Sequence, residues 1–201
     1  MSEVPRIALF GGTFDPIHLG HLQIAEDARK LLALDQVRFL PCHISPHKLG
    51  AHSAPPADRL EMVRLAIAGL PWAVADDHDL VCPQPAYSWR TAEEMAQRFP
   101  GARLFWLMGA DQWRALPRWS HPERLATVVE FIVFARDGVP EPPADPTWRL
   151  HFLTGTHPAS ATAIRAGLAR GEDADGDGSD TRAWLPPAVA AYIRERGLYK
   201  G

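Results

Sequence analysis

The sequence predicts an α/β protein with a doubly wound parallel sheet and helices on both faces of that sheet. Short apolar runs bounded by turn residues alternate along the chain with longer segments of helical periodicity. The apolar runs are continuous, as in strands buried on both faces, whereas half-exposed strands alternate apolar and polar residues. Ligands of such sheets bind at the carboxyl ends of the strands, so we expect the site in the loops that follow them.

The predicted strands share one pattern, a short and mainly apolar run between turn-forming residues. Helices between most of these runs imply parallel pairing of the strands. In chain order the predicted strands are Ile7–Phe10, Val37–Leu40, Trp72–Ala75, Leu104–Met108, Phe131–Ala135 and Leu150–Leu153.

The predicted helices lie between most of these strands, and two more follow the last one. Two of them carry an N-cap signature, because Asp58 and Thr91 are each followed three positions later by a glutamate. Ser88 is an alternative cap for the second of these helices. The predicted helices are Leu19–Leu34, Asp58–Leu70, Ser88–Phe99, Pro122–Thr127, Thr162–Arg170 and Pro186–Arg196.

Length and composition narrow the class of protein. The 201 residues fit one domain, 1–201. A chain of this length buries enough apolar surface to fold without stabilising disulfides or metal ions. The formal net charge of −3 argues against a nucleic-acid partner, and two cysteines exclude a disulfide framework. The sequence contains no long apolar run and no signal-peptide pattern at its start. We therefore expect a cytoplasmic protein with no membrane partner.

The first predicted strand runs directly into the segment Gly-Gly-Thr-Phe-Asp-Pro-Ile-His-Leu-Gly-His at 11–21. Paired glycines let backbone N–H groups approach a ligand, and the following helix N-terminus favours an anion. His18 and His21 are three residues apart, so both fit one face of the first helical turn. Gly20 leaves room between them for a bulky ligand. The segment predicts a phosphate site with two imidazole donors that stabilise charge on phosphate oxygens.

Other interpretations of these residues are a simple turn, structural histidines, or half of a zinc site. No His-Glu-x-x-His pattern and no cysteine cluster completes a zinc site in the sequence, so no protein metal site is expected. The ordered combination of strand, glycine pair, histidine pair and helix is far more specific than its parts. We interpret Asp15 as a residue that holds this loop in place.

This segment resembles the nucleotidyltransferase form of the His-x-Gly-His motif, found in adenylyl and cytidylyl transferases of Rossmann-like fold. Those enzymes place an acceptor phosphate on the α-phosphorus of a nucleoside triphosphate and release pyrophosphate. Aminoacyl-tRNA synthetases share the histidine motif. They would need a longer chain and a Lys-Met-Ser-Lys-Ser loop, and this sequence has neither.

A second segment, Ser160-Ala-Thr162-Ala-Ile-Arg165, opens a predicted helix after the last strand. It resembles the second phosphate motif of the same enzymes. Ser160 or Thr162 can cap the helix, whose N–H groups then face a phosphate, and Arg165 adds a permanent positive charge. An ordinary capped helix with a solvated arginine is the alternative.

Four further segments resemble bacterial nicotinate mononucleotide adenylyltransferases, so the resemblance extends from Gly11 to Tyr199. The chain departs from the family pattern at Ser45 and Ala86, where the family has Pro and Ser, and at Ser88, where it has Thr. The matching segments are Pro-Cys-His-Ile-Ser-Pro-His-Lys at 41–48, Pro-Ala-Tyr-Ser at 85–88 with Thr91, Gly-Ala-Asp at 109–111 with Leu-Pro-Arg-Trp at 116–119, and 185–199.

The resemblance also implies roles. Trp119 would stack on the pyridine ring, Asp111 would bind sugar hydroxyls, and backbone amides at Ser88 and Trp89 would bind the nicotinate carboxylate. Segment 160–201 would complete the phosphate site. The implied catalytic residues are His18, His21, Lys48 and Arg165. The implied ATP-binding residues are Gly11, Gly12, Thr13, Phe14, His18, Gly20, His21, Gly109, Asp111, Ser160, Thr162 and Arg165, and the mononucleotide-binding residues are Lys48, Tyr87, Ser88, Trp89, Asp111 and Trp119.

Three of these residues keep an alternative interpretation: Trp119 as core, Asp111 as a helix cap and Lys48 as a solvated lysine. The implied reaction joins ATP and nicotinate mononucleotide into deamido-NAD and pyrophosphate, with Mg²⁺ carried by ATP. Two other functions stay open, pantetheine-phosphate adenylyltransferase and a nucleotide-binding sensor without turnover. A homo-oligomer is also open.

Overall fold

The computed structural model describes residues 4–43, 53–136, 138, 145–170 and 181–200. All six predicted strands are confirmed, each within two residues of its expected ends. They are β1 (Arg6–Gly12), β2 (Gln36–Pro41), β3 (Ala73–Ala75), β4 (Arg103–Gly109), β5 (Val129–Ala135) and β6 (Leu150–Thr154).

The strands form one parallel sheet in the order β3-β2-β1-β4-β5-β6. The chain builds outward from β1 to β3 and then returns to place β4 on the other side of β1. The doubly wound fold is therefore confirmed, and its order reverses between β1 and β4. The carboxyl ends of these two strands form the crevice in which such folds bind ligands.

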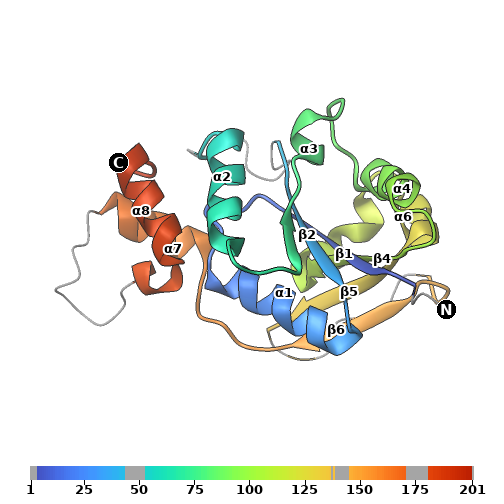
Figure 1. The fold of residues 1–201 in the computed structure, drawn as a ribbon. Coiled ribbons are helices and arrows are strands. Elements are labelled where there is room, and N and C mark those ends of the chain that lie inside the picture. The colour runs from blue at the N-terminus through green and yellow to red at the C-terminus, as the bar shows by residue number, and fades with distance from the viewer. Residues whose placement is uncertain (1–3, 44–52, 137, 139–144, 171–180, 201) are drawn as a thin grey trace.

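Two apolar layers cover the sheet because successive side chains of a strand point to opposite faces. Phe10, Phe39 and Phe105 belong to the core on the α1 and α2 side. Leu9 and Trp106 belong to the core on the α4 and α6 side. Figure 1 shows the two pairs of helices on opposite sides of the sheet, with α7 and α8 grouped at one end beside α2.

The six predicted helices are confirmed, and two short helices that are not among these six follow strands β3 and β4. None of the helices in the described part of the chain is long and apolar enough to cross a membrane.

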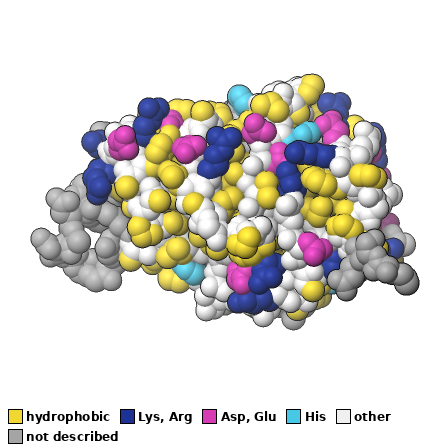
Figure 2. Space-filling view, in the orientation of Figure 1, with side chains coloured by type: hydrophobic (Ala, Val, Ile, Leu, Met, Phe, Trp, Pro, Cys, Tyr) yellow, Lys and Arg dark blue, Asp and Glu magenta, His cyan; other side chains and the backbone are white. Residues whose placement is uncertain are grey.

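On the face drawn in Figure 2, basic and acidic side chains are intermingled. The helices are α1 (Leu19–Leu32), α2 (Pro56–Ile67), α3 (His78–Val81), α4 (Ser88–Arg98), α5 (Ala110–Ala115), α6 (Pro122–Val128), α7 (Ala161–Ala169) and α8 (Pro187–Arg196), with 3₁₀ turns η1 (Leu116–Arg118) and η2 (Thr181–Trp184).

Both predicted N-caps are wrong, because tertiary contacts take their side chains. Helix α2 begins at Pro56, and Asp58 lies in its first turn, where it accepts a 2.7 Å hydrogen bond from Tyr192. Helix α4 begins at Ser88, and Thr91 is buried inside it, donating a 2.7 Å hydrogen bond to Asp79. A cap signature reflects only the neighbouring residues of the sequence. A hydrogen bond to a residue farther along the chain can therefore place the side chain elsewhere.

Candidate active site

A cavity of about 760 Å³ lies at the carboxyl ends of β1 and β4, where the strand order reverses. Three walls meet there: the loop from β1 to α1, the start of α5 after β4, and the start of α7. Its lining residues are Phe10, Gly11, Gly12, Thr13, Phe14, Asp15, His18, His21, Ile24, Gly109, Ala110, Asp111, Gln112, Arg114, Phe134, Arg136, Ser160 and Ala161. Nine of the residues expected from the sequence to bind ATP are therefore in one place: Gly11, Gly12, Thr13, Phe14, His18, His21, Gly109, Asp111 and Ser160.

The two histidines stack at the start of α1, with ring centroids 3.8 Å apart and an interplanar angle of 25°. His18 is the N-cap residue, and its backbone N–H donates to Nδ1 of His21 at 3.3 Å. A neutral imidazole that accepts at Nδ1 carries its proton on Nε2, so this contact selects the Nε2–H tautomer of His21. The local fold thus holds a donor nitrogen in a defined orientation.

The electrostatic environment keeps His18 neutral. Its pKa is lowered to about 4, first by burial and then by the positive charges of His157 and Arg136. At neutral pH the ring is therefore an uncharged hydrogen-bonding group. Its Nδ1 is buried and makes no hydrogen bond within the described residues. Arg136 and Arg114 both line the same cavity as permanent cations, and Arg114 pairs with Asp111.

Gly20 does not line the cavity, which differs from the expectation that a ligand would occupy the space above it. A Cβ at this position would lie 3.0 Å from Nδ1 of His18 and 3.2 Å from Nδ1 of His157. The missing side chain therefore leaves room for two imidazoles of the protein itself. Gly20 therefore allows the close packing of His18 and His157, and its contact with ATP stays a prediction.

Buried groups behind the loop hold it in place. Oδ1 of Asp15 accepts hydrogen bonds from the backbone N–H of Ala54 at 3.0 Å and from the phenol of Tyr199 at 2.6 Å. Asp15 is only 3% exposed, and its role as the residue that fixes the loop agrees with the interpretation of the sequence. Phe14 is also buried and has a left-handed backbone (φ 48°), which is strained for an aromatic residue.

A second brace comes from Arg59 on α2, which is 1% exposed. Its guanidinium donates to the carbonyl oxygens of Thr13 (2.6 Å), Cys42 (2.7 Å), His43 (3.0 Å) and Ala54 (3.1 Å). It therefore ties the first loop to the end of β2 and to the start of α2. No motif pointed to Arg59, because its partners are main-chain atoms.

The second wall of the cavity is the short helix α5. Asp111 is its second residue and is not its cap, since Gly109 occupies that position. Its carboxylate is almost fully exposed at the cavity and pairs with Arg114, one turn along the helix. A carboxylate so placed can accept hydrogen bonds from hydroxyl groups of a bound ligand.

The third wall is the start of α7, where Ser160 is the N-cap residue but its side chain makes no capping hydrogen bond. Arg165 lies one turn behind and does not line the cavity. Its Nη1 donates to the carbonyl oxygen of Asp15 at 2.6 Å, and its Nη2 approaches Thr162 Oγ1 at 3.5 Å. In this conformation Arg165 therefore braces the first loop, and Thr162 braces Arg165.

Of the residues expected to bind the mononucleotide, Asp111 lines this cavity, and the four others that the structure describes do not. Tyr87, Ser88 and Trp89 form the start of α4, and Trp119 follows η1, packed against the same core layer as Trp89. Trp89 is buried beneath the guanidinium of Arg124, which lies 3.7 Å from its ring centroid. Lys48 falls outside the described residues.

Two residues of the site had no motif of their own, Arg136 and His157. Arg136 follows the carboxyl end of β5, which is a position where chemistry is expected in a parallel sheet. His157 lies three residues before Ser160, and its Nδ1 accepts the backbone N–H of Ala159 at 3.0 Å. The strand-end rule could have found Arg136, whereas His157 needed the fold.

The fold and the cavity define a nucleotide-binding α/β protein with a His-x-Gly-His loop at the reversal of strand order. A family model described as cytidylyltransferase-like matches residues 9–167. A relative from Aeromonas salmonicida, named "Probable nicotinate-nucleotide adenylyltransferase", is 37% identical to this chain. The match covers 100% of this chain and 99% of the relative. A relative from Thermus thermophilus with the same name is 38% identical, over 97% of this chain and 100% of its own.

Among solved structures, the chain is similar to the Plasmodium falciparum nicotinic acid mononucleotide adenylyltransferase complexed with NaAD. The TM-score is 0.77 at 18% identity, over 97% of each chain, which supports the fold. The chain belongs to the cytidylyltransferase-like family and, within it, to the nicotinate-nucleotide adenylyltransferases.

Proposed function

We propose that the protein transfers AMP from ATP to nicotinate mononucleotide, forming deamido-NAD and pyrophosphate in NAD biosynthesis. The observation that carries this proposal is the stacked pair of His18 and His21 in the cavity at the reversal of strand order. Membership of the adenylyltransferase family supports the substrate pair. The related structure titled as a complex with NaAD is in keeping with it.

The proposed reaction needs positioning and charge stabilisation, and no protein nucleophile. The acceptor phosphomonoester is largely a dianion at neutral pH, because its second pKa is about 6. Its oxygen attacks the α-phosphorus of ATP, and the bond from that phosphorus to the bridging oxygen of pyrophosphate breaks. His18, which is neutral, and His21 can donate hydrogen bonds to the oxygens where charge develops, and Arg136 supplies a fixed positive charge.

Magnesium enters as part of the ATP substrate. Asp15 and Asp111 are the acidic residues lining the cavity; Asp15 is held by Ala54 and Tyr199, and Asp111 pairs with Arg114. Phosphate oxygens and water are therefore the expected Mg²⁺ ligands, as is common for this ion. The chain's part is to orient the triphosphate through the backbone of Gly11, Gly12 and the start of α7.

The same proposal implies that ATP and nicotinate mononucleotide bind at two separate places. ATP would occupy the cavity, with its sugar near Asp111, and Lys48 would reach the phosphates from its loop. Arg165 would act on the phosphates after release from Asp15, or hold the loop that contacts them. The mononucleotide would bind toward α4 and η1, with the nicotinate ring against Trp119 and its carboxylate at the amides of Ser88 and Trp89.

Pyrophosphate release tests the proposal with Mg²⁺-ATP and four separate acceptor conditions: nicotinate mononucleotide, nicotinamide mononucleotide, 4′-phosphopantetheine and no acceptor. Fast release with nicotinate mononucleotide, and formation of deamido-NAD, is the expected result. Release only with phosphopantetheine would instead assign the second adenylyltransferase activity. Nucleotide binding without release under any condition would favour a sensor.

A further inference from the structure

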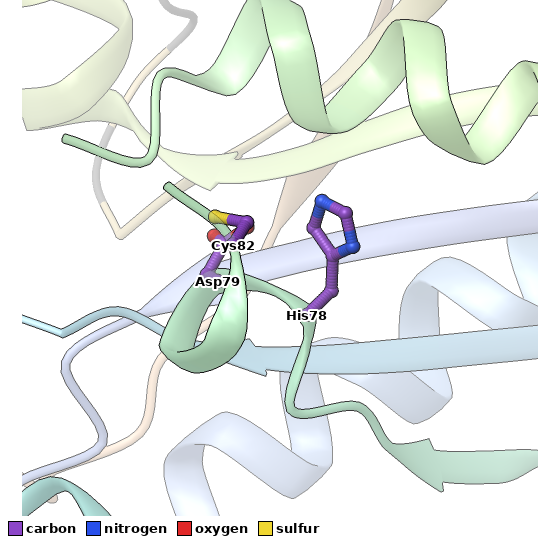
Figure 3. A group of neighbouring side chains, drawn as sticks. All are labelled: His78, Asp79 and Cys82. Atoms are coloured by element: carbon purple, nitrogen blue, oxygen red, sulfur yellow. The ribbon is translucent and has the colours of Figure 1, made fainter. Parts of the chain in front are cut away.

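His78, Asp79 and Cys82 bring three metal-ligating groups together, and none of the three lines the cavity. Their nitrogen, oxygen and sulfur ligand atoms all lie within 4.8 Å of one another. The spacing contributes to the cluster, because Cys82, the C-cap residue of α3, is three residues after Asp79 and four after His78, and side chains at these spacings are neighbours on a helix. Figure 3 shows the Cys82 sulfur beside the Asp79 carboxylate, with the His78 ring on the same side of the turn.

Within the described part of the chain, the Asp79 carboxylate accepts a hydrogen bond from Thr91 and pairs with no lysine or arginine. It is 6% exposed and accepts a 2.7 Å hydrogen bond from Thr91 Oγ1. Among the described residues, no lysine or arginine forms an ion pair with it, and burial raises its pKa to about 6. Nearby Asp76 differs, because Arg38 pairs with it at 2.6 Å. A buried carboxylate in such surroundings is stabilised by a bound cation.

His78 and Cys82 complete the cluster with a nitrogen and a sulfur atom. Burial and the negative charges of Asp79 and Glu94 raise the pKa of the Cys82 thiol. His78 Nε2 lies 3.1 Å from a carboxylate oxygen of Glu94 on α4, so a fourth oxygen is beside the cluster. A divalent cation would neutralise the thiolate and the Asp79 carboxylate together, and Glu94 is in reach of the same space.

We propose that His78, Asp79 and Cys82 bind a zinc-type divalent cation, with Glu94 or water as the fourth ligand. One sulfur, one nitrogen and one oxygen donor favour zinc over magnesium or calcium, which prefer oxygen alone. Tetrahedral zinc needs ligand atoms about 3.5 Å apart, so small rotamer changes complete the site. Binding releases the thiol proton of Cys82, and no redox step is involved.

The site would hold the connection between α3 and α4 in place. Gln84 Nε2 already donates to the carbonyl oxygens of Asp79 and Cys82, at 3.0 and 3.1 Å. A metal bound to Cys82 would add a direct link from this turn to α4 through Glu94. The proposal stands apart from adenylyl transfer, since metal binding is measured without substrates.

Cobalt(II) absorption tests the site, because a cobalt–thiolate bond adds a charge-transfer band that histidine or carboxylate ligands cannot produce. Metal-free full-length protein is titrated with Co²⁺ in the absence of nucleotide. Cys82→Ser and Cys42→Ser form a matched pair, because both cysteines are partly exposed and unbridged. Wild type and Cys42→Ser should show the band at one equivalent, and Cys82→Ser should lose it.

Zinc competition with a chromophoric chelator gives a second readout. The Kd for Zn²⁺ should rise at least about tenfold in Cys82→Ser and in His78→Gln, compared with Cys42→Ser. Circular dichroism of each metal-free variant checks the fold. Absence of the band in wild type, its persistence in Cys82→Ser, or equal zinc affinities of the two cysteine variants would overturn the proposal.

Discussion

The phenol of Tyr199 donates a 2.6 Å hydrogen bond to the carboxylate of Asp15, which joins the last turn of the described chain to the first loop. Arg165 adds a second link, from α7 to the carbonyl oxygen of the same aspartate. Burial and the bond to Asp15 raise the pKa of Tyr199, so the phenol remains a donor at physiological pH. Arg165 on α7 and Tyr199 after α8 thus both contact Asp15 of the first loop.

Tyr199→Phe should lower both stability and turnover. Loss of one hydrogen bond to a buried carboxylate costs about 1.5 kcal/mol, and a looser Asp15 loop should reduce kcat several-fold. Tyr192→Phe is a matched control, because Tyr192 donates a similar 2.7 Å bond to Asp58, away from the cavity. Urea unfolding and steady-state kinetics check both variants. Equal kcat losses in the two variants would contradict a loop-specific role.

His18→Ala should reduce kcat by about 10²-fold or more, as expected for loss of a donor to developing charge. His121→Ala serves as control, because His121 is exposed, pairs with Glu123 and lies in a T-shaped contact with Trp89, and does not line the cavity. Pyrophosphate release at saturating substrates measures the effect. Wild-type turnover in His18→Ala would remove the ring from the catalytic machinery.

Stability should fall as the pH drops from about 6.5 to 4, because His18 resists protonation only in the folded chain. With a folded pKa of about 4, the unfolded state binds the proton first, so the free energy of unfolding decreases on acidification. Between pH 7 and pH 5 the loss from His18 is about 2 kcal/mol. Urea unfolding at both values should show a smaller difference for His18→Gln than for wild type. An identical difference would show that His18 does not titrate in this way.

Arg59→Lys should destabilise the fold by about 3 kcal/mol, because an ammonium group cannot reach four carbonyl oxygens at once. Arg64→Lys on the same helix is the control. Arg64 is exposed and pairs with Glu61 at 3.5 Å, so its replacement should cost less than about 0.5 kcal/mol. Denaturant midpoints compare the two, and similar midpoints would contradict the bracing role of Arg59.

Trp119→Ala should raise the KM for nicotinate mononucleotide about tenfold and leave the KM for ATP unchanged. Loss of a stacking partner for the pyridine ring costs about 1–2 kcal/mol. Trp148→Ala is the control, because Trp148 is also half-buried against the same core layer. If both variants are less stable but keep the wild-type KM for nicotinate mononucleotide, Trp119 is a core residue and not a binding residue.

The strand positions and the first loop could be predicted because their signals are local. A continuous apolar run identifies a buried strand, and the segment from Gly11 to His21 combines a turn, a helix start and two donors within eleven residues. The sequence also placed Asp111 and Ser160 at strand-following loops, and both line the cavity. Strand-end loops converge in any parallel sheet, so their meeting follows from topology.

Partners distant along the chain could not be predicted in this way. The cap signatures at Asp58 and Thr91 failed because Tyr192 and Asp79 bind those side chains in the folded protein. The neutral state of His18 likewise depends on burial and on the charges of His157 and Arg136, which are more than a hundred residues away along the chain. Short-range patterns are encoded in neighbouring residues, whereas burial and charge around a group exist only once the sheet, α1 and α7 have packed together.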